Sequence, residues 1–324
     1  MKKIHKIGIA TSASNIIGSE KRFDRAISIL RKLNYDIVVG PLAKKQYYYA
    51  AGIISQRANE INNLIYSDVD AIMFSIGGLT SVSLLDKIDY EYLKNCEKQF
   101  IGNSDITAIL LAVYTLTEKP VIYAQTLLPC FGEEGWALEE NIKYFKDILE
   151  CNSKYRYHMP KVWTDEWKNW LNFSEEKIKR KNKWIVYNKG YASGKLIGGN
   201  LQTLIKLLGS KYFPKLDKSI LFLEDTSVNA EMTESAVYTL KNSGAIDNIA
   251  GLIIGKCENY SSQEMQEGYG EWVSKLIAKK DIPILLDFDC GHTFPCMPLI
   301  IGEEYFLDCT NEKNPIVELQ INKS

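Results

Sequence analysis

The sequence predicts an α/β fold built on parallel β-sheet. Short, largely apolar runs such as Ala71–Ile76 and Ser219–Leu223 end in Gly or acidic residues, which is typical of buried strands. Amphipathic stretches such as residues 23–33 lie between these runs. The alternation indicates βαβ units and a doubly wound, layered architecture. Ligands of such sheets bind at the carboxyl ends of the strands, so polar residues at those ends are the first candidates for a site.

Each half of the chain repeats this pattern. In the first half we expect strands at 7–10, 35–39, 71–76, up to Gly102 and at 121–124, and helices at 23–33, 53–65, from Asp105 onward and at 138–149. In the second half we expect strands at 219–223, 250–255, 282–286, 305–307 and 316–321, and helices at 200–209, 230–242 and 272–279. Residues 151–190 show no clear period, but their tryptophans argue against disorder. We therefore expect a domain at 1–150, an interdomain segment at 151–190 and a second domain at 191–324.

Composition narrows the class of protein. The 324 residues include 39 basic and 40 acidic side chains, so no overall charge favours a nucleic acid polymer or an anionic membrane surface. No apolar run approaches the roughly 18 residues of a transmembrane helix, and the N-terminus lacks the apolar core of a secretory signal. The 7 cysteines form no CxxC pairs, which favours reduced thiols. We expect a cytoplasmic protein.

The stretch from Phe100 to Leu110 is the first candidate for chemistry. A strand-like run ends in Gly102, and Ser104 and Asp105 then open a helix-like run. A serine on such a turn presents its hydroxyl above the sheet, as a nucleophile requires, although Ile106 stands where the G-x-S-x-G elbow has its second glycine. The alternative is a Ser-Asp cap of an ordinary helix.

A nucleophilic serine needs a base and a group that orients the base. His292 follows a buried strand and lies in a tight turn, whereas His5 and His158 are better explained as surface residues. Glu224 ends another buried strand. In a catalytic interpretation, Glu224 accepts the Nδ1–H of His292 and stabilises its imidazolium.

Three further groups complete the expected site. The backbone N–H groups of Gly78 and Asp105 are candidates for an oxyanion hole, and Gly77 is a candidate substrate-binding residue. Asn200, at a predicted helix start, is a candidate substrate-binding group.

A competing interpretation takes the aspartates and the cysteine near His292 as a metal site, but their spacing matches no standard zinc motif. The residues proposed for the metal are Asp287, Asp289, Cys290 and His292.

Four motifs occur in the order found in one known family. They are Ile101–Ala108, Gly198–Leu201, Leu221–Asp225 and Asp289–Pro295. On these motifs the chain resembles the LD-carboxypeptidase family of serine peptidases, which includes the microcin C self-immunity peptidases. The resemblance implies a triad of Ser104, Glu224 and His292, catalysis without a metal or other cofactor, and a homodimer. It also implies a Rossmann-like N-terminal domain similar to class I glutamine amidotransferases and a smaller C-terminal domain of the swivelling β/β/α type.

The branch of the family determines the expected substrate. Leu127–Glu133 and Val162–Trp167 resemble the self-immunity branch, in which aromatic residues of the interdomain loop stack on a nucleotide base. The resemblance thus implies an amide bond in a peptidyl- or aminoacyl-nucleotide, with Trp167 and Trp170 as candidate stacking residues. The alternative is that the tryptophans stack on no base and only bury an irregular segment. A murein tetrapeptide that releases D-alanine is the alternative substrate, and a non-catalytic small-ligand binding module is the alternative class.

Overall fold

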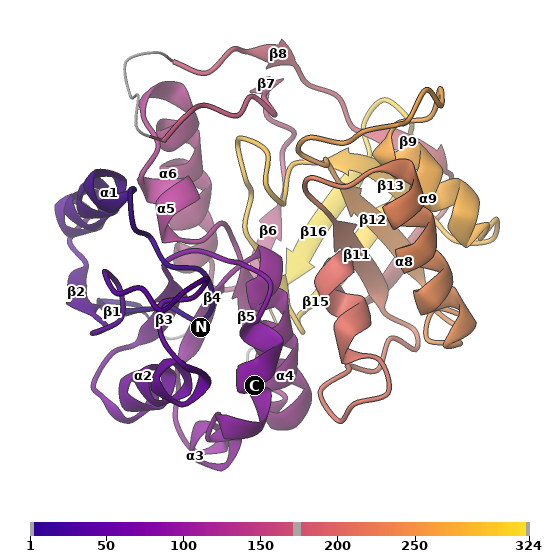
Figure 1. Cartoon of the computed structure of the whole chain (residues 1–324). Helices are drawn as coiled ribbons and strands as arrows, with labels where there is room; N and C mark the ends of the chain where they lie inside the picture. The colour runs from indigo at the N-terminus through magenta and orange to yellow at the C-terminus, as the bar shows by residue number, and fades with distance from the viewer. Residues whose placement is uncertain (1–2, 171–175, 322–324) are drawn as a thin grey trace.

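The computed structural model describes residues 3–170 and 176–321, which form two β-sheets side by side (Figure 1). The sheet of the N-terminal half has six strands in the order β14-β5-β4-β3-β1-β2. Five of them run parallel, and β14 pairs antiparallel with β5. The strands are β1 (Lys6–Ala10), β2 (Asp36–Val39), β3 (Ala71–Phe74), β4 (Gln99–Gly102), β5 (Val121–Tyr123) and β14 (Leu299–Ile301).

Helices cover both faces of this sheet because its strands are apolar on both sides. Met73 packs with one core cluster, whereas its neighbours Ile72 and Phe74 point to the opposite face and belong to a second cluster. The helices on the Met73 side are α1 (Glu20–Lys32), α5 (Leu127–Phe131) and α6 (Gly135–Glu150). Those on the other side are α2 (Ile54–Tyr66), α3 (Tyr90–Lys94) and α4 (Thr107–Thr117).

The second sheet has eight strands, in the order β6-β16-β15-β10-β11-β12-β13-β9. Its parallel centre is β10 (Tyr191–Asn200), β11 (Ile220–Glu224), β12 (Gly251–Gly255) and β13 (Ile284–Phe288). Antiparallel strands flank it: β6 (Lys154–Arg156), β9 (Ile185–Asn188), β15 (Glu304–Asp308) and β16 (Ile316–Gln320). Its helices are α7 (Leu201–Leu204), α8 (Ala230–Asn242) and α9 (Tyr269–Ile277). The predicted α/β fold with parallel sheets is confirmed.

The structure differs from the sequence-based expectation in three places. The expected helix at 200–209 is only the short α7 followed by a 3-10 turn at Ile205–Leu207, and the two glycines before it, Gly198 and Gly199, belong to strand β10. The segment 151–190 is not only a connection, since its strands β6 and β9 are the two edges of the second sheet. Finally, β14 lies beyond residue 191 in sequence but completes the N-terminal sheet.

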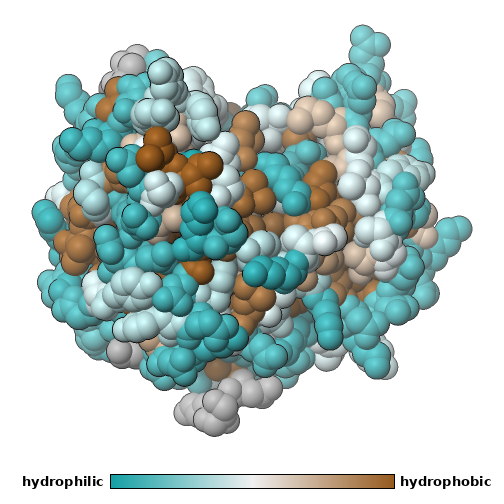
Figure 2. Space-filling model, turned by 60° about the horizontal axis from the view of Figure 1, so that its bottom comes forward, coloured by the Kyte–Doolittle hydropathy of each residue, from teal (hydrophilic) through white to brown (hydrophobic). Residues whose placement is uncertain are grey.

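One apolar core joins the two halves. Helix α4 contacts both α7 and β10, and a single buried cluster runs from Phe100 through Ile109 to Phe222. Figure 2 shows the indentation between the two lobes, with apolar side chains gathered along it. Within residues 3–170 and 176–321, no helix is long and apolar enough to cross a membrane.

Candidate active site

Ser104 lies on a strained turn at the carboxyl end of β4. It opens a 3-10 turn, Ser104–Ile106, that leads into α4, and its φ of 59° is rare for a residue with a side chain. Gly77, in the loop after β3, allows this close approach. A Cβ at position 77 would lie 3.0 Å from the Cβ of Ser104 and 3.1 Å from its Oγ. The turn therefore depends on a missing side chain in the neighbouring loop.

Glu224 and His292 form a buried pair. Glu224 is the last residue of β11 and is fully buried, and its Oε2 lies 2.7 Å from Nδ1 of His292. The loop after β13 approaches Glu224 closely, because a Cβ at Gly291 would lie 2.6 Å from the same oxygen. With Nδ1 held by the carboxylate, the imidazole has Nε2 left for another partner.

Neighbouring carboxylates determine the charge of His292. Burial disfavours the imidazolium, but the negative charge of Glu224 and its hydrogen bond, with further contributions from Glu258 and Asp225, outweigh burial. The result is a pKa of about 9 for His292. The pKa of Asp225 also rises, to about 7, because of burial and the adjacent Glu224.

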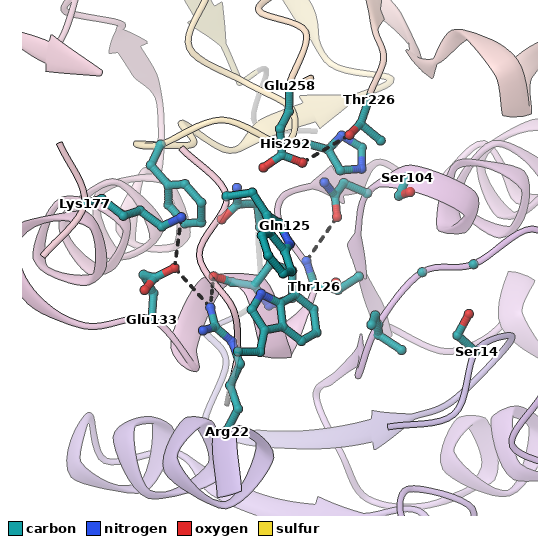
Figure 3. Close-up of a pocket in the computed structure, with 18 residues that line it drawn as sticks. Ser14, Arg22, Ser104, Gln125, Thr126, Glu133, Lys177, Thr226, Glu258 and His292 are labelled. Atoms are coloured by element: carbon teal, nitrogen blue, oxygen red, sulfur yellow. Dashed lines mark hydrogen bonds and ion pairs between the residues drawn. The ribbon is translucent and has the colours of Figure 1, made fainter. Parts of the chain in front are cut away.

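Ser104 and His292 line one cavity of about 320 Å³ between the two halves of the chain (Figure 3). Tyr123, on β5, connects the two sides behind them. Its hydroxyl donates to Oε1 of Glu224 at 2.6 Å and accepts the backbone N–H of Ser104 at 3.3 Å. The serine turn and the acidic residue thus share one buried hydroxyl.

Side chains of the first half also hold the His292 loop. Asn103 donates to the carbonyl of Gly291 at 3.2 Å, and Gln125 donates to the carbonyl of Thr293 at 3.1 Å. Asn141 accepts the N–H of Cys296 at 2.8 Å. Sequence reasoning missed these amides and Tyr123. The only signal for Asn103, Tyr123 and Gln125 was their position at or after the ends of strands, and Asn141, inside α6, gave no such signal.

Gly78, in the loop after β3, lines the same cavity as Ser104, and Asp105 is the residue that follows Ser104 in the chain. Within the described residues, neither backbone N–H donates to another backbone group. The Asp105 side chain does not cap α4 as the sequence suggested, since its carboxylate accepts the N–H of Ser81 at 2.8 Å. The N-cap of α4 is Ile106.

Asn200 lies behind Glu224 rather than in the cavity. Its Nδ2 donates to Glu224 at 3.2 Å and to Asp225 at 3.1 Å, while its Oδ1 caps α7 by accepting the N–H of Thr203. The predicted capping role is confirmed. As a substrate-binding residue it is poorly placed, because it is 5% exposed and does not line the cavity.

Trp167 and Trp170 both line the cavity. Trp167 is 66% exposed, whereas Trp170 is half-buried and has the guanidinium of Arg22 4.8 Å from its ring centroid. Glu133 lies beside them and pairs with two cations, Arg22 at 3.1 Å and Lys177 at 3.6 Å. Figure 3 shows these three charged side chains together, apart from Ser104.

The residues of the metal interpretation have other partners. Asp289 is fully buried and accepts hydrogen bonds from Asn182, Trp184 and Lys256. His292 points its Nδ1 to Glu224 instead. Across residues 3–170 and 176–321, no group of three or more His, Cys, Asp or Glu has the arrangement of a metal site. Asp289 is therefore better described as the partner of a buried lysine.

A serine at a strand-to-helix turn and a histidine polarised by a buried carboxylate, both facing one cavity, are the parts that serine hydrolases use. Fold and site thus define the class as an α/β hydrolytic enzyme of the serine type. The family follows from sequence comparison. Residues 7–124 match the LD-carboxypeptidase N-terminal domain and residues 193–307 match the LD-carboxypeptidase C-terminal domain. The chain therefore belongs to the LD-carboxypeptidase family of serine peptidases.

Individual relatives support the same assignment. The chain is 34% identical over 318 residues to the microcin C7 self-immunity protein MccF of Escherichia coli, covering 95% of this chain and 92% of that protein. A solved structure of MccF in complex with aspartyl sulfamoyl adenosine superposes with a TM-score of 0.93 at 31% identity and covers 99% of this chain and 97% of that one. A muramoyltetrapeptide carboxypeptidase from Oxalobacter formigenes shares the fold, with a TM-score of 0.80 at 18% identity over 98% of this chain and 100% of that one.

Proposed function

We propose that the protein hydrolyses an amide bond in an aminoacyl- or peptidyl-nucleotide, with Ser104, His292 and Glu224 as its catalytic triad. The 2.7 Å contact between Glu224 and Nδ1 of His292, beside Ser104 in one cavity, carries this proposal. The similarity to MccF, which has been solved with aspartyl sulfamoyl adenosine bound, supports the class of substrate.

The proposed chemistry follows the serine hydrolase sequence. Oγ of Ser104 attacks the scissile carbonyl while Nε2 of His292 takes the hydroxyl proton, and Glu224 stabilises the imidazolium. The N–H groups of Gly78 and Asp105 donate to the oxyanion of the tetrahedral intermediate. His292 then returns the proton to the leaving nitrogen, and water hydrolyses the acyl-enzyme by the same route. No metal or other cofactor takes part.

The cavity beyond the triad suits a nucleoside. Trp167 offers an exposed ring on which a base stacks, a contact of about 1–3 kcal/mol per base. Arg22 and Lys177 also line the cavity, and their guanidinium and ammonium groups are donors for the anionic linkage of a nucleotide.

A murein tetrapeptide is the second candidate substrate, with D-alanine as the leaving group. The family itself supports it, since its two domains are those of LD-carboxypeptidases. The fold shared with the Oxalobacter formigenes enzyme is consistent with it.

The test compares the two substrates directly. Purified protein and the Ser104→Ala variant are incubated separately with an aminoacyl sulfamoyl adenosine and with a murein tetrapeptide, and the products are followed by mass spectrometry. We expect cleavage of the nucleotide conjugate and a loss on the order of 10⁴- to 10⁶-fold in Ser104→Ala. Release of D-alanine alone would assign the protein to murein recycling instead, and cleavage that persists in Ser104→Ala would reject the triad.

We further propose a cytoplasmic location and a homodimer. The 7 free cysteines support a reducing compartment. The homodimer rests on the family resemblance. The mass of the protein in solution, measured by light scattering, tests whether it is a dimer.

A further inference from the structure

Lys256 is a buried cation that contacts three successive residues of the chain before His292. Its backbone N–H donates to the carbonyl of Phe288 at 3.1 Å. Its Nζ donates to the carbonyl of Asp287 and to Oδ1 of Asp289, the latter at 2.8 Å. The lysine side chain is only 4% exposed. An ammonium without partners would be costly in such a place, so the lysine and the loop after β13 stabilise each other.

The start of this loop needs such support. Asp287, the fourth residue of β13, has a φ of 59°, in the left-handed region that residues with a side chain rarely adopt. The pairing of β12 with β13 also shifts register between Ile253 and Gly255. Strained backbone persists only where its surroundings fix it, and Nζ of Lys256 does so by binding the Asp287 carbonyl. The loop that begins at this residue leads directly to His292.

Asp289 shares its two oxygens between Lys256 and the segment that carries the cavity tryptophans. Oδ1 accepts the lysine, whereas Oδ2 accepts Nδ2 of Asn182 at 2.9 Å and Nε1 of Trp184 at 2.7 Å. The ring of Trp163, from the same segment, has its centroid 5.4 Å from Nζ of the lysine. A buried ion pair whose other hydrogen bonds are also satisfied holds one geometry. The carboxylate is therefore fixed from two directions.

We propose that Lys256 is a positioning residue that fixes, through Asp289 and the Asp287 carbonyl, the loop that presents the catalytic histidine. This inference rests on the proposed function, in which His292 takes the proton of Ser104. Lys256 does not line the cavity, so it acts through the loop and not on the substrate. Its contribution is the placement of the base, and a misplacement of about 1 Å costs about 100-fold in rate.

The experiment removes the ammonium and keeps the unbranched shape of its side chain. In Lys256→Met, Asp289 retains its hydrogen bonds from Asn182 and Trp184. Kinetics are measured with an aminoacyl sulfamoyl adenosine and with a murein tetrapeptide. For the substrate that is cleaved, we expect kcat to fall about 10- to 100-fold and KM to change by less than about 3-fold, because the base moves and the cavity does not.

An NMR signal reports the position of His292 without any substrate. The proton on its Nδ1 lies in the 2.7 Å contact with Glu224, and a proton in so short a hydrogen bond to a carboxylate resonates far downfield. The signal is assigned by its loss in His292→Asn. We expect it to move upfield, or to disappear through exchange with water, in Lys256→Met. A lysine that served only the stability of the fold would leave this signal in place.

Lys119→Met is the matched control. Nζ of Lys119 also donates to two backbone carbonyls, those of Leu93 and Cys96, but this lysine does not line the cavity. The variant should lose stability in urea unfolding without a change in kcat or in the His292 signal. If Lys256→Met does not fold, the double variant Lys256→Met/Asp289→Asn replaces it, because it also removes the carboxylate charge that the lysine neutralised.

Each outcome decides for or against the role of Lys256. A lower kcat together with a displaced His292 signal, absent from Lys119→Met, supports the inference. An unchanged kcat, a lower kcat with the signal in place, or the same changes in the control overturn it while the proposed function stands.

If the wild-type protein cleaves neither substrate, the proposed function fails and the NMR signal alone decides. A displacement in Lys256→Met that is absent from Lys119→Met supports the positioning of His292 by the lysine. An unchanged signal, or an equal displacement in both variants, overturns it. A wild-type protein without such a signal would contradict the short contact with Glu224, and the inference with it.

Discussion

His292 holds a proton at neutral pH in the free protein because three carboxylates surround its ring. Glu224, Glu258 and Asp225 outweigh the effect of burial and raise its pKa to about 9. In the proposed mechanism His292 must be neutral to accept the proton of Ser104, so kcat/KM should increase with pH from 7, reach half of its maximum near 9 and level off above that pH. The pH dependence of kcat/KM measures this midpoint.

NMR provides the direct check on this prediction. The chain has only 3 histidines, so the His292 signal can be assigned by its loss in His292→Asn. We expect a midpoint near 9 in the wild type. In Glu224→Gln the midpoint should be lower, because the largest contribution that favours the imidazolium is removed and burial then dominates. A wild-type midpoint near 6.5, the value of an unperturbed histidine, would contradict the geometry.

At the scale of elements, the strands and helices that sequence predicted best are those with a clear period. The helix expected at 230–242 is α8 with the same bounds, and the strand expected at 250–255 is β12, one residue shorter. Strand β10 was missed because its glycines lower strand propensity. Gly198 is required there, since the carbonyl of Phe222 occupies the space where its Cβ would lie. That contact is tertiary and leaves no local signal.

The loop after β3 and the turn after β4 meet at one point, between Gly77 and Ser104. Gly77→Ala would place a methyl group 3.1 Å from Oγ of Ser104, and the serine would have to move. The required shift is a few tenths of an ångström, and a displacement of about 1 Å costs about 100-fold, so we expect kcat to fall several-fold with little loss of stability. Activity assays and urea unfolding separate the two effects.

Gly268→Ala is the matched control for this substitution. Gly268 precedes α9 with a φ of −72°, and a Cβ there would meet no atom within 4 Å. It should retain nearly full activity. An active Gly77→Ala protein would show that the serine turn tolerates the crowding and that the glycine is not needed there.

For the whole molecule, sequence reasoning brought Ser104, Glu224 and His292 to one place, and the structure puts Glu224 against His292 and lines one cavity with His292 and Ser104. Ser104, Glu224 and His292 each end a strand or follow one, and parallel strands bring such ends together. The crossing of β14 into the N-terminal sheet could not be predicted, because a three-residue apolar run carries no information on its partner. The same holds for the amides of Asn103 and Gln125, whose roles depend on a loop more than 160 residues away.

Tyr123 joins the two halves at the site, because it belongs to the N-terminal sheet and donates to Glu224 of the second sheet. Burial raises its pKa well above that of a free tyrosine, so the hydroxyl remains a donor. Tyr123→Phe leaves Glu224 with one donor fewer and the N–H of Ser104 without its acceptor. We expect a loss of about 1–3 kcal/mol in the free energy of unfolding and a lower kcat.

The pH profile identifies the cause of the lower rate. A carboxylate with fewer donors holds the imidazolium more tightly, so the midpoint of kcat/KM in Tyr123→Phe should move to higher pH than in the wild type. Tyr90→Phe is the matched control, since the Tyr90 hydroxyl is buried and has no hydrogen-bond partner among the described residues. Removing the Tyr90 hydroxyl should leave both the profile and the stability nearly unchanged.

If Tyr123→Phe behaved like Tyr90→Phe, the connection between the two sheets through the Tyr123 hydroxyl would have no part in catalysis. A lower rate with an unshifted midpoint would limit Tyr123 to holding the Ser104 turn.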